Sequence, residues 1–236
     1  MDQSDPELQN NRVDNAVAIA RGVLGAVPFA GGALAEIIGY AIPNQRVDRI
    51  IAFLHELDKR LEKVEIERLH QNKYALDLFE DGMYQSVKVL SDLRNQYLAN
   101  FLKQSIDVNS KSYSTRKQLL NILQELTDDD LEVLISIYKN HYQSTARERS
   151  VRSLTYGQYD DLSDEEREEY EHAKVSFGLH MATLSRLNLI YIKHKEVDPE
   201  WDNSHIDIHT GLPEIENCEL TNIGKLLLVN IGASKC

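Results

Sequence analysis

Apolar residues recur at helical spacing through the first half of the chain, most clearly in residues 44–64. There they alternate in steps of three and four, at Val47, Ile50, Leu54, Leu57, Leu61 and Val64. Charged residues fill most of the other positions. This spacing is typical of a coiled-coil seam. It predicts one long helix, with Asn44 as its N-cap, that packs a narrow apolar face on a partner helix in the same chain or in another.

The remaining pattern before residue 114 is also helical. Apolar positions predict helices over about 13–27 and 33–41, the second ending before Pro43. Residues 74–107 predict one or two more, with Gly82 or the Ser91-Asp92 pair as the break. The polar first 11 residues are expected to be disordered, and the Ser-rich stretch 108–114 is a candidate linker. Residues 12–113 are therefore expected to form a helical bundle.

The second half changes from helices only to helices followed by strands. Helices are predicted over 115–126 and from Thr127, a good N-cap followed by three aspartates. After an irregular stretch at 143–161, Ser163 and Glu166 form a capping box. A helix ending near residue 189 then runs into a strand, "IYIKH". A second strand edge, "CEL", precedes a closing helix capped by Thr221.

That order of elements resembles a winged-helix domain over residues 114–236. The resemblance rests on "ATLSRLNLIYI" and on "CELTNIGKLLLVNI". The predicted fold class is therefore mostly α: a helical bundle with a long coiled-coil-like helix, followed by a winged-helix-like α+β domain. A winged helix that binds DNA needs basic residues around its third helix, and the candidates here are Arg186, Lys193 and Lys195.

Charge argues against nucleic acid as the main partner. The formal net charge is −12, and 27% of the residues are charged against 42% hydrophobic. Such a surface repels phosphate and anionic lipid on average. The two cysteines cannot form a disulfide framework, and no signal-peptide pattern opens the chain. We therefore expect a cytoplasmic protein that makes a protein contact or a homo-oligomer.

The apolar segment 22–43 contains a single charged residue, Glu36, and five of the 11 glycines. Its prolines and glycine pair would break a membrane-spanning helix, and it lacks a phosphate-loop motif. A close-packed helical hairpin is the simplest interpretation, and a hairpin that engages a membrane or a partner upon activation is the alternative. The residues that would make this contact are Gly22, Gly25, Pro28, Phe29, Gly31, Gly32, Glu36 and Gly39.

Catalytic and metal-binding signals are weak. Arg49 and His55 resemble the motif of HEPN-type ribonucleases in spacing only. His205, Asp207 and His209 would share one face of a strand, but three ligands on one straight strand lie too far apart for a single ion. No Ser-His-Asp order, nucleophile elbow, paired-cysteine or calcium-loop motif is found. We expect no catalytic residue, no metal and no cofactor.

The whole chain also resembles a loosely defined set of bacterial helical proteins of phage-defence or abortive-infection type. The segments that carry the resemblance are "VPFAGGALAEII", "IPNQRVDRIIAFLHELDKRL", "FEDGMYQSVKVLSDLRNQYLANFL" and "LLNILQELTDDDLEVL". The resemblance implies a non-enzymatic interaction protein or effector of bacterial defence, membrane-active if its hairpin opens. The alternatives are a winged-helix transcriptional regulator that dimerises through the seam from Val47 to Val64, and a HEPN-like ribonuclease.

Overall fold

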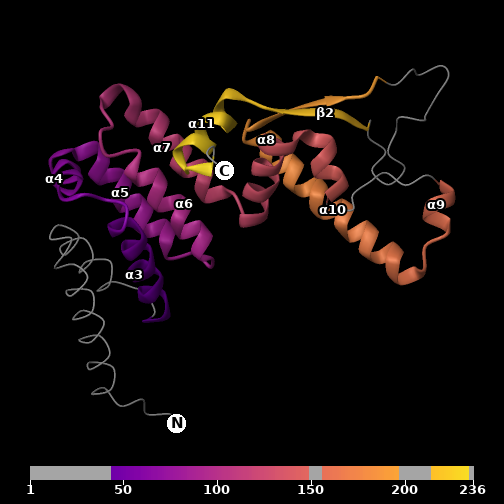
Figure 1. Cartoon of the computed structure of the whole chain (residues 1–236), viewed down its shortest axis with the longest axis horizontal. Helices are drawn as coiled ribbons and strands as arrows, with labels where there is room; N and C mark the ends of the chain where they lie inside the picture. Colours follow the sequence, from indigo (N-terminus) through magenta and orange to yellow (C-terminus); the bar gives the residue numbers. More distant parts are fainter. Residues whose placement is uncertain (1–43, 149–155, 197–213, 234–236) are drawn as a thin grey trace, which may run out of the picture. The chain divides into compact units, whose positions relative to one another are not determined.

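The computed structural model describes residues 44–148, 156–196 and 214–233 (Figure 1). Over these residues the chain is 73% helical, with nine helices and one two-stranded sheet. The predicted mostly helical class is confirmed at that level. The apolar segment 22–43, predicted to form a hairpin, and the candidate metal ligands His205, Asp207 and His209 lie outside the described residues. The chain forms two compact units: residues 125–228 make the second, and the residues from Val229 onward belong with the first.

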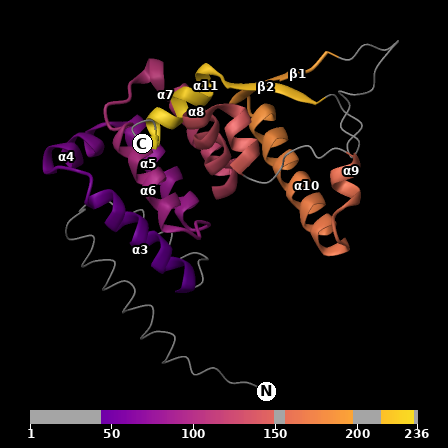
Figure 2. The ribbon, with the colours of Figure 1, turned by 45° about the vertical axis from the view of Figure 1, so that its right-hand side comes forward.

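The first unit contains five helices, drawn in indigo to magenta in Figures 1 and 2. They are α3 (Asn44–Asp58), α4 (Lys63–Gln71), α5 (Lys73–Ser86), α6 (Asp92–Lys103) and α7 (Ser110–Glu125). Helix α6 packs against both α3 and α5, and α4 packs on α5. The core between them holds Phe53, Phe79 and Phe101, each almost fully buried.

The predicted long helix from Val47 to Val64 is wrong, because α3 ends at Asp58 and α4 begins only at Lys63. The turn between them is held by contacts with α6. The Arg60 side chain donates to Asn100 Oδ1 at 2.8 Å, and Lys103 donates to the Arg60 carbonyl at 2.6 Å. Glu62 then caps α4. These contacts join residues that are distant in the sequence, so local spacing could not reveal them.

The seam residues consequently split into two groups. Ile50, Leu54 and Leu57 are buried, on the helix that packs against α6 and α5. Leu61 lies in the turn, and the Val64 side chain is 53% exposed on α4. The apolar face of α3 is therefore buried by packing within the same chain, which was one of the two predicted outcomes.

The sequence predicted a possible break before α6 but not the start of α7. Ser91, in one of the two predicted breaks, caps α6 by accepting a hydrogen bond from the Arg94 backbone N–H. The predicted linker 108–114 is wrong over most of its length, since α7 begins at Ser110. Asn109 Oδ1 accepts from the backbone N–H groups of Lys111 and Ser112. The Ser-rich stretch is therefore a capped helix start rather than a spacer.

The second unit starts with three helices and ends with a two-stranded ribbon and α11. Its elements are α8 (Asp128–Glu148), α9 (Tyr156–Asp160), α10 (Asp164–Arg186), β1 (Ile190–His194), β2 (Ile215–Leu220) and α11 (Asn222–Asn230). The strands are antiparallel, with Ile192 opposite Cys218 and an irregularity between Lys193 and His194. Helix α8 continues past residue 143, where an irregular stretch was expected.

All three predicted caps of this unit are confirmed. Ser163 and Glu166 form the expected capping box at α10. Thr127 Oγ1 accepts from the Asp130 backbone N–H at 3.1 Å. Thr221 Oγ1 accepts from the Gly224 backbone N–H at 3.1 Å and itself donates to the carbonyl oxygen of Asn188. The last cap ties α11 to the turn that precedes β1.

Candidate functional site

The two candidate DNA-binding lysines lie on the β1–β2 ribbon, and each contacts a carboxylate of the opposite segment. Lys193 Nζ is 2.6 Å from Glu216, and Lys195 Nζ is 2.7 Å from Glu214. The hydrogen bond with Glu216 raises the pKa of Lys193. The Lys195 backbone N–H also donates to the Glu214 carbonyl, extending the ribbon past β1. Both lysines are thus paired with acids across the ribbon.

The third candidate, Arg186, ends α10 and is paired in the same way. Its guanidinium donates to a carboxylate oxygen of Glu125 at 2.9 Å, with both side chains well exposed. The three predicted cations therefore lie close together in sequence, and each forms an ion pair with an acid while its side chain stays partly exposed to solvent. Exposed ion pairs of this kind contribute little stability, yet they lower the positive potential that a phosphate would meet.

A buried polar cluster lies on the inner face of α10, where it contacts the start of α8. His180 Nδ1 is 2.8 Å from Asp130 Oδ1, and Ser176 Oγ is 3.3 Å from the other ring nitrogen of His180. The second oxygen of Asp130 accepts from the backbone N–H and the hydroxyl of Thr127. Asp130 is almost fully buried. Each of its oxygens is satisfied, so the cluster joins two helices rather than opening onto a cleft.

The ribonuclease-like pair Arg49 and His55 is not assembled into one site within α3. Their offset along the sequence places them about 120° apart around the helix axis. Arg49 donates to the Val87 carbonyl at 3.0 Å, and His55 is exposed. Arg49 therefore ties α3 to the end of α5, and the ribonuclease hypothesis gains no support from the described geometry.

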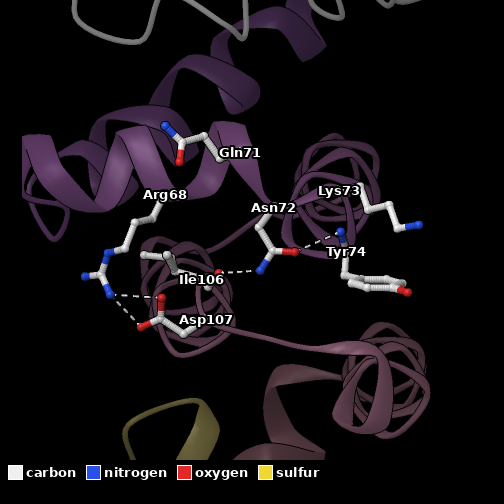
Figure 3. A pocket seen from close by; sticks show the side chains of 7 residues that line it. All are labelled: Arg68, Gln71, Asn72, Lys73, Tyr74, Ile106 and Asp107. Atoms are coloured by element: carbon white, nitrogen blue, oxygen red, sulfur yellow. Dashed lines mark hydrogen bonds and ion pairs between the residues drawn. The ribbon is translucent and has the colours of Figure 1, made fainter.

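A cavity of about 470 Å³ opens in the first unit between α4, α5 and the turn after α6 (Figure 3). The side chains that line it are Arg68, Gln71, Asn72, Lys73, Tyr74, Ile106 and Asp107. Arg68 binds both carboxylate oxygens of Asp107, at 2.9 and 2.7 Å. The Asn72 amide donates to the Ile106 and Val108 carbonyls, and its oxygen accepts from Tyr74 N–H. These groups hold α4, α5 and the turn together.

An ion-paired cluster joins α5 to α7 beside this cavity. Lys117 Nζ is 2.6 Å from both Asp77 and Asp81, and the Tyr113 hydroxyl donates to Asp77 at 2.7 Å. Burial alone would raise the pKa of Asp77, but hydrogen bonds from Lys117 and Tyr113 outweigh it and lower that pKa. Burial would lower the pKa of Lys117, but its bonds to the two acids raise it. The cluster is a structural contact in which the single Lys117 ammonium binds both carboxylates, so one negative charge remains uncompensated.

Replacing Lys117 by methionine should raise the pKa of Asp77, since the bond from its main cationic partner is lost. Because the pKa of Asp77 in the folded protein is lower than its ordinary value of 3.8, the ionised carboxylate stabilises the fold at pH values above 3.8. This stabilisation is lost as the pH falls through the lowered pKa. The variant should therefore lose stability at neutral pH and become less sensitive to acid. Carboxyl-carbon NMR titration measures the shift, with the exposed Lys111→Met as control; an unchanged Asp77 titration would contradict the assignment.

Other chemistry is sparse in the described part of the chain. Burial raises the pKa of the Cys218 thiol to about 12, so this cysteine stays protonated and is a poor nucleophile. Among the described residues no cluster of three or more His, Cys, Asp or Glu side chains is placed to hold a metal ion. Helices in the described ranges are also too short or too polar to cross a membrane.

Comparisons with family models, with curated proteins and with solved structures gave no significant match to this chain. Sequence reasoning named the three cations but missed their partners Glu125, Glu214 and Glu216. The sequence did contain a signal for two of these partners, Glu214 and Glu216. Glu214 and Glu216 are two residues apart, as are Lys193 and Lys195, and this spacing places each pair on one face of a strand.

Proposed function

We propose that the protein is a non-enzymatic interaction protein whose C-terminal unit is a winged-helix-type module that binds protein rather than DNA. The order α8–α9–α10–β1–β2–α11, with an antiparallel ribbon after the third helix, fits such a module. The single observation that carries the choice of partner is the pairing of both ribbon lysines, Lys193 and Lys195, with carboxylates. A DNA-binding wing needs cations that are free to replace the counterions of phosphate.

The alternative of a DNA-binding dimer is disfavoured, because the apolar face that was predicted to form the dimer interface is buried. Ile50, Leu54 and Leu57 are buried, on a helix that packs within its own chain. A regulator that dimerises through α3 would have to unpack its first unit. The proposed role in bacterial defence rests on the resemblance described above, together with the apolar segment 22–43, which lies outside the described residues.

Binding to a DNA duplex, followed by fluorescence anisotropy over a series of salt concentrations, tests the proposal. We expect the wild-type chain to show no salt-dependent binding. The double variant Glu214→Gln/Glu216→Gln releases Lys193 and Lys195 and should gain weak, salt-sensitive binding, because each free cation adds one phosphate contact.

Glu165→Gln/Glu169→Gln is the matched control. It also removes two negative charges, but from exposed positions on α10 that form no ion pair with either lysine. The control should leave DNA binding absent. Salt-sensitive binding by the wild type that is weakened by Lys193→Gln would overturn the proposal in favour of the DNA-binding regulator.

A further inference from the structure

The outer face of α10 carries an exposed stripe at coiled-coil spacing. Along the helix, exposed residues recur in steps of four and three, at Glu168, His172, Val175, Leu179, Ala182 and Arg186. The opposite face holds the buried side chains Tyr170, Phe177, Met181 and Leu184. The stripe is therefore a second seam on the same helix, with an apolar centre, on the side that the described residues of its own unit leave exposed.

The centre of this stripe is unusually apolar for an exposed surface. Val175 is 61% exposed and Leu179 is 65% exposed, and the two lie one turn apart. Ala182 continues the stripe, and no atom of the described residues lies within 4 Å of the position that a Cβ on neighbouring Gly178 would occupy. Small side chains beside two larger ones let another helix approach closely. The short α9 contacts α10 elsewhere, through Tyr170 and Arg167.

Charge along α10 indicates which helix fits the stripe. The N-terminal half of α10 is acidic, and its Glu168 lies on the stripe. Arg186 is the last residue of the stripe and lies beyond the apolar centre. A second copy of α10 lying antiparallel brings Glu168 opposite Arg186, His172 opposite Ala182, and Val175 opposite Leu179. One register satisfies all three pairs, and two-fold symmetry makes each pair twice. A parallel copy would instead place Glu168 against its own equivalent.

We propose that two copies of the chain pair antiparallel through the outer face of α10, centred on Val175 and Leu179. The pairing goes beyond the proposed function, because it would hold whether the C-terminal unit binds protein or DNA. Arg186 is available for this contact: its pair with Glu125 is solvent-exposed, and the guanidinium has further donors for a carboxylate of the second copy. The acidic surface around the stripe disfavours a nucleic acid or an anionic membrane as its occupant.

Sedimentation velocity of the full chain over a wide concentration range tests the pairing. The wild type should form a dimer as its concentration rises. Leu179→Glu should raise the dimer dissociation constant at least about tenfold, because it buries a carboxylate in the apolar centre. Leu90→Glu is the matched control, since Leu90 is the most exposed large apolar residue described, at 84%, and lies in the first unit. A wild type that stays monomeric at the highest concentration would overturn the pairing.

Exchange of the two charges tests the antiparallel register with substitutions at exposed positions only. Glu168→Arg alone and Arg186→Glu alone should each weaken the dimer, because each places like charges opposite one another. Combining them restores opposite charges and should return the dissociation constant to within about threefold of the wild type. A double variant no tighter than the single ones would overturn the proposed register, and circular dichroism checks that each variant stays folded.

Discussion

Replacing Gly224 by alanine should destabilise the second unit by at least about 3 kcal/mol, the upper end of the usual cost of overpacking. A Cβ at this position would overlap the backbone carbonyl of Leu189 and would lie 2.7 Å from a methyl carbon of Leu220. The Leu189 carbonyl is held in place by the hydrogen bond that it accepts from the Thr221 backbone N–H at 3.0 Å. Relief of the overlap would therefore pull α11 away from β1.

Gly178→Ala is the matched control for this substitution. Gly178 also lies within a helix of the second unit, but its added Cβ would have no neighbour within 4 Å in the described part of the chain. We expect the control to stabilise the protein by up to about 1 kcal/mol, through the higher helix propensity of alanine. Urea unfolding followed by circular dichroism, at a concentration that keeps the chain monomeric, measures both. A Gly224→Ala protein as stable as the control would contradict the close approach of α11 to β1.

Asp130→Ala should lower the free energy of unfolding by about 2–4 kcal/mol, because it removes both a buried acceptor and part of a helix cap. The carboxylate is almost fully buried and satisfies the backbone N–H and hydroxyl of Thr127 and a ring nitrogen of His180. Alanine leaves the His180 ring nitrogen, on a side chain that is only 16% exposed, without this acceptor, and an unsatisfied buried polar group costs about 1–3 kcal/mol. The loss of the cap at the start of α8 adds about 1 kcal/mol.

Asp129→Ala serves as the comparison, because Asp129 lies in the same first turn of α8 but is exposed. It should cost only about 0.3–1 kcal/mol, the value of one acid at a helix N-terminus. Thermal unfolding of the two variants and of His180→Ala would separate the contributions. Equal losses in Asp129→Ala and Asp130→Ala would show that the helix dipole, rather than the buried cluster, accounts for the effect.

The features that could be predicted from the sequence are those that depend on near neighbours. Thr127, Ser163 and Thr221 were identified as caps because a cap needs only a hydroxyl and the next three residues. The strand "IYIKH" was found from the composition of its five residues. What failed depended on distant contacts: the end of α3 at Asp58 follows from the bonds that join Arg60 to Asn100 and Lys103 of α6.

The candidate site shows the same limit. The three cations were visible as residue types, but whether a lysine on a strand is free depends on the strand beside it. Similarly, the stripe on α10 has the same spacing as the predicted seam on α3, and only burial distinguishes them. Periodicity identifies a face that could pack, whereas the contacts of the fold decide which face is already used.

The return of the chain to the first unit at Val229 makes the second unit an insertion, joined to the first by two covalent connections. Asn100 of α6 donates to the Ile231 carbonyl at 3.0 Å, and Ile231 and Ala233 are buried. Gly232 lies beside Asn100 with a φ of +77°, a backbone conformation that suits glycine. A fragment cut at residue 124 would therefore lack part of its own core, and separating the halves requires supplying this last segment in trans.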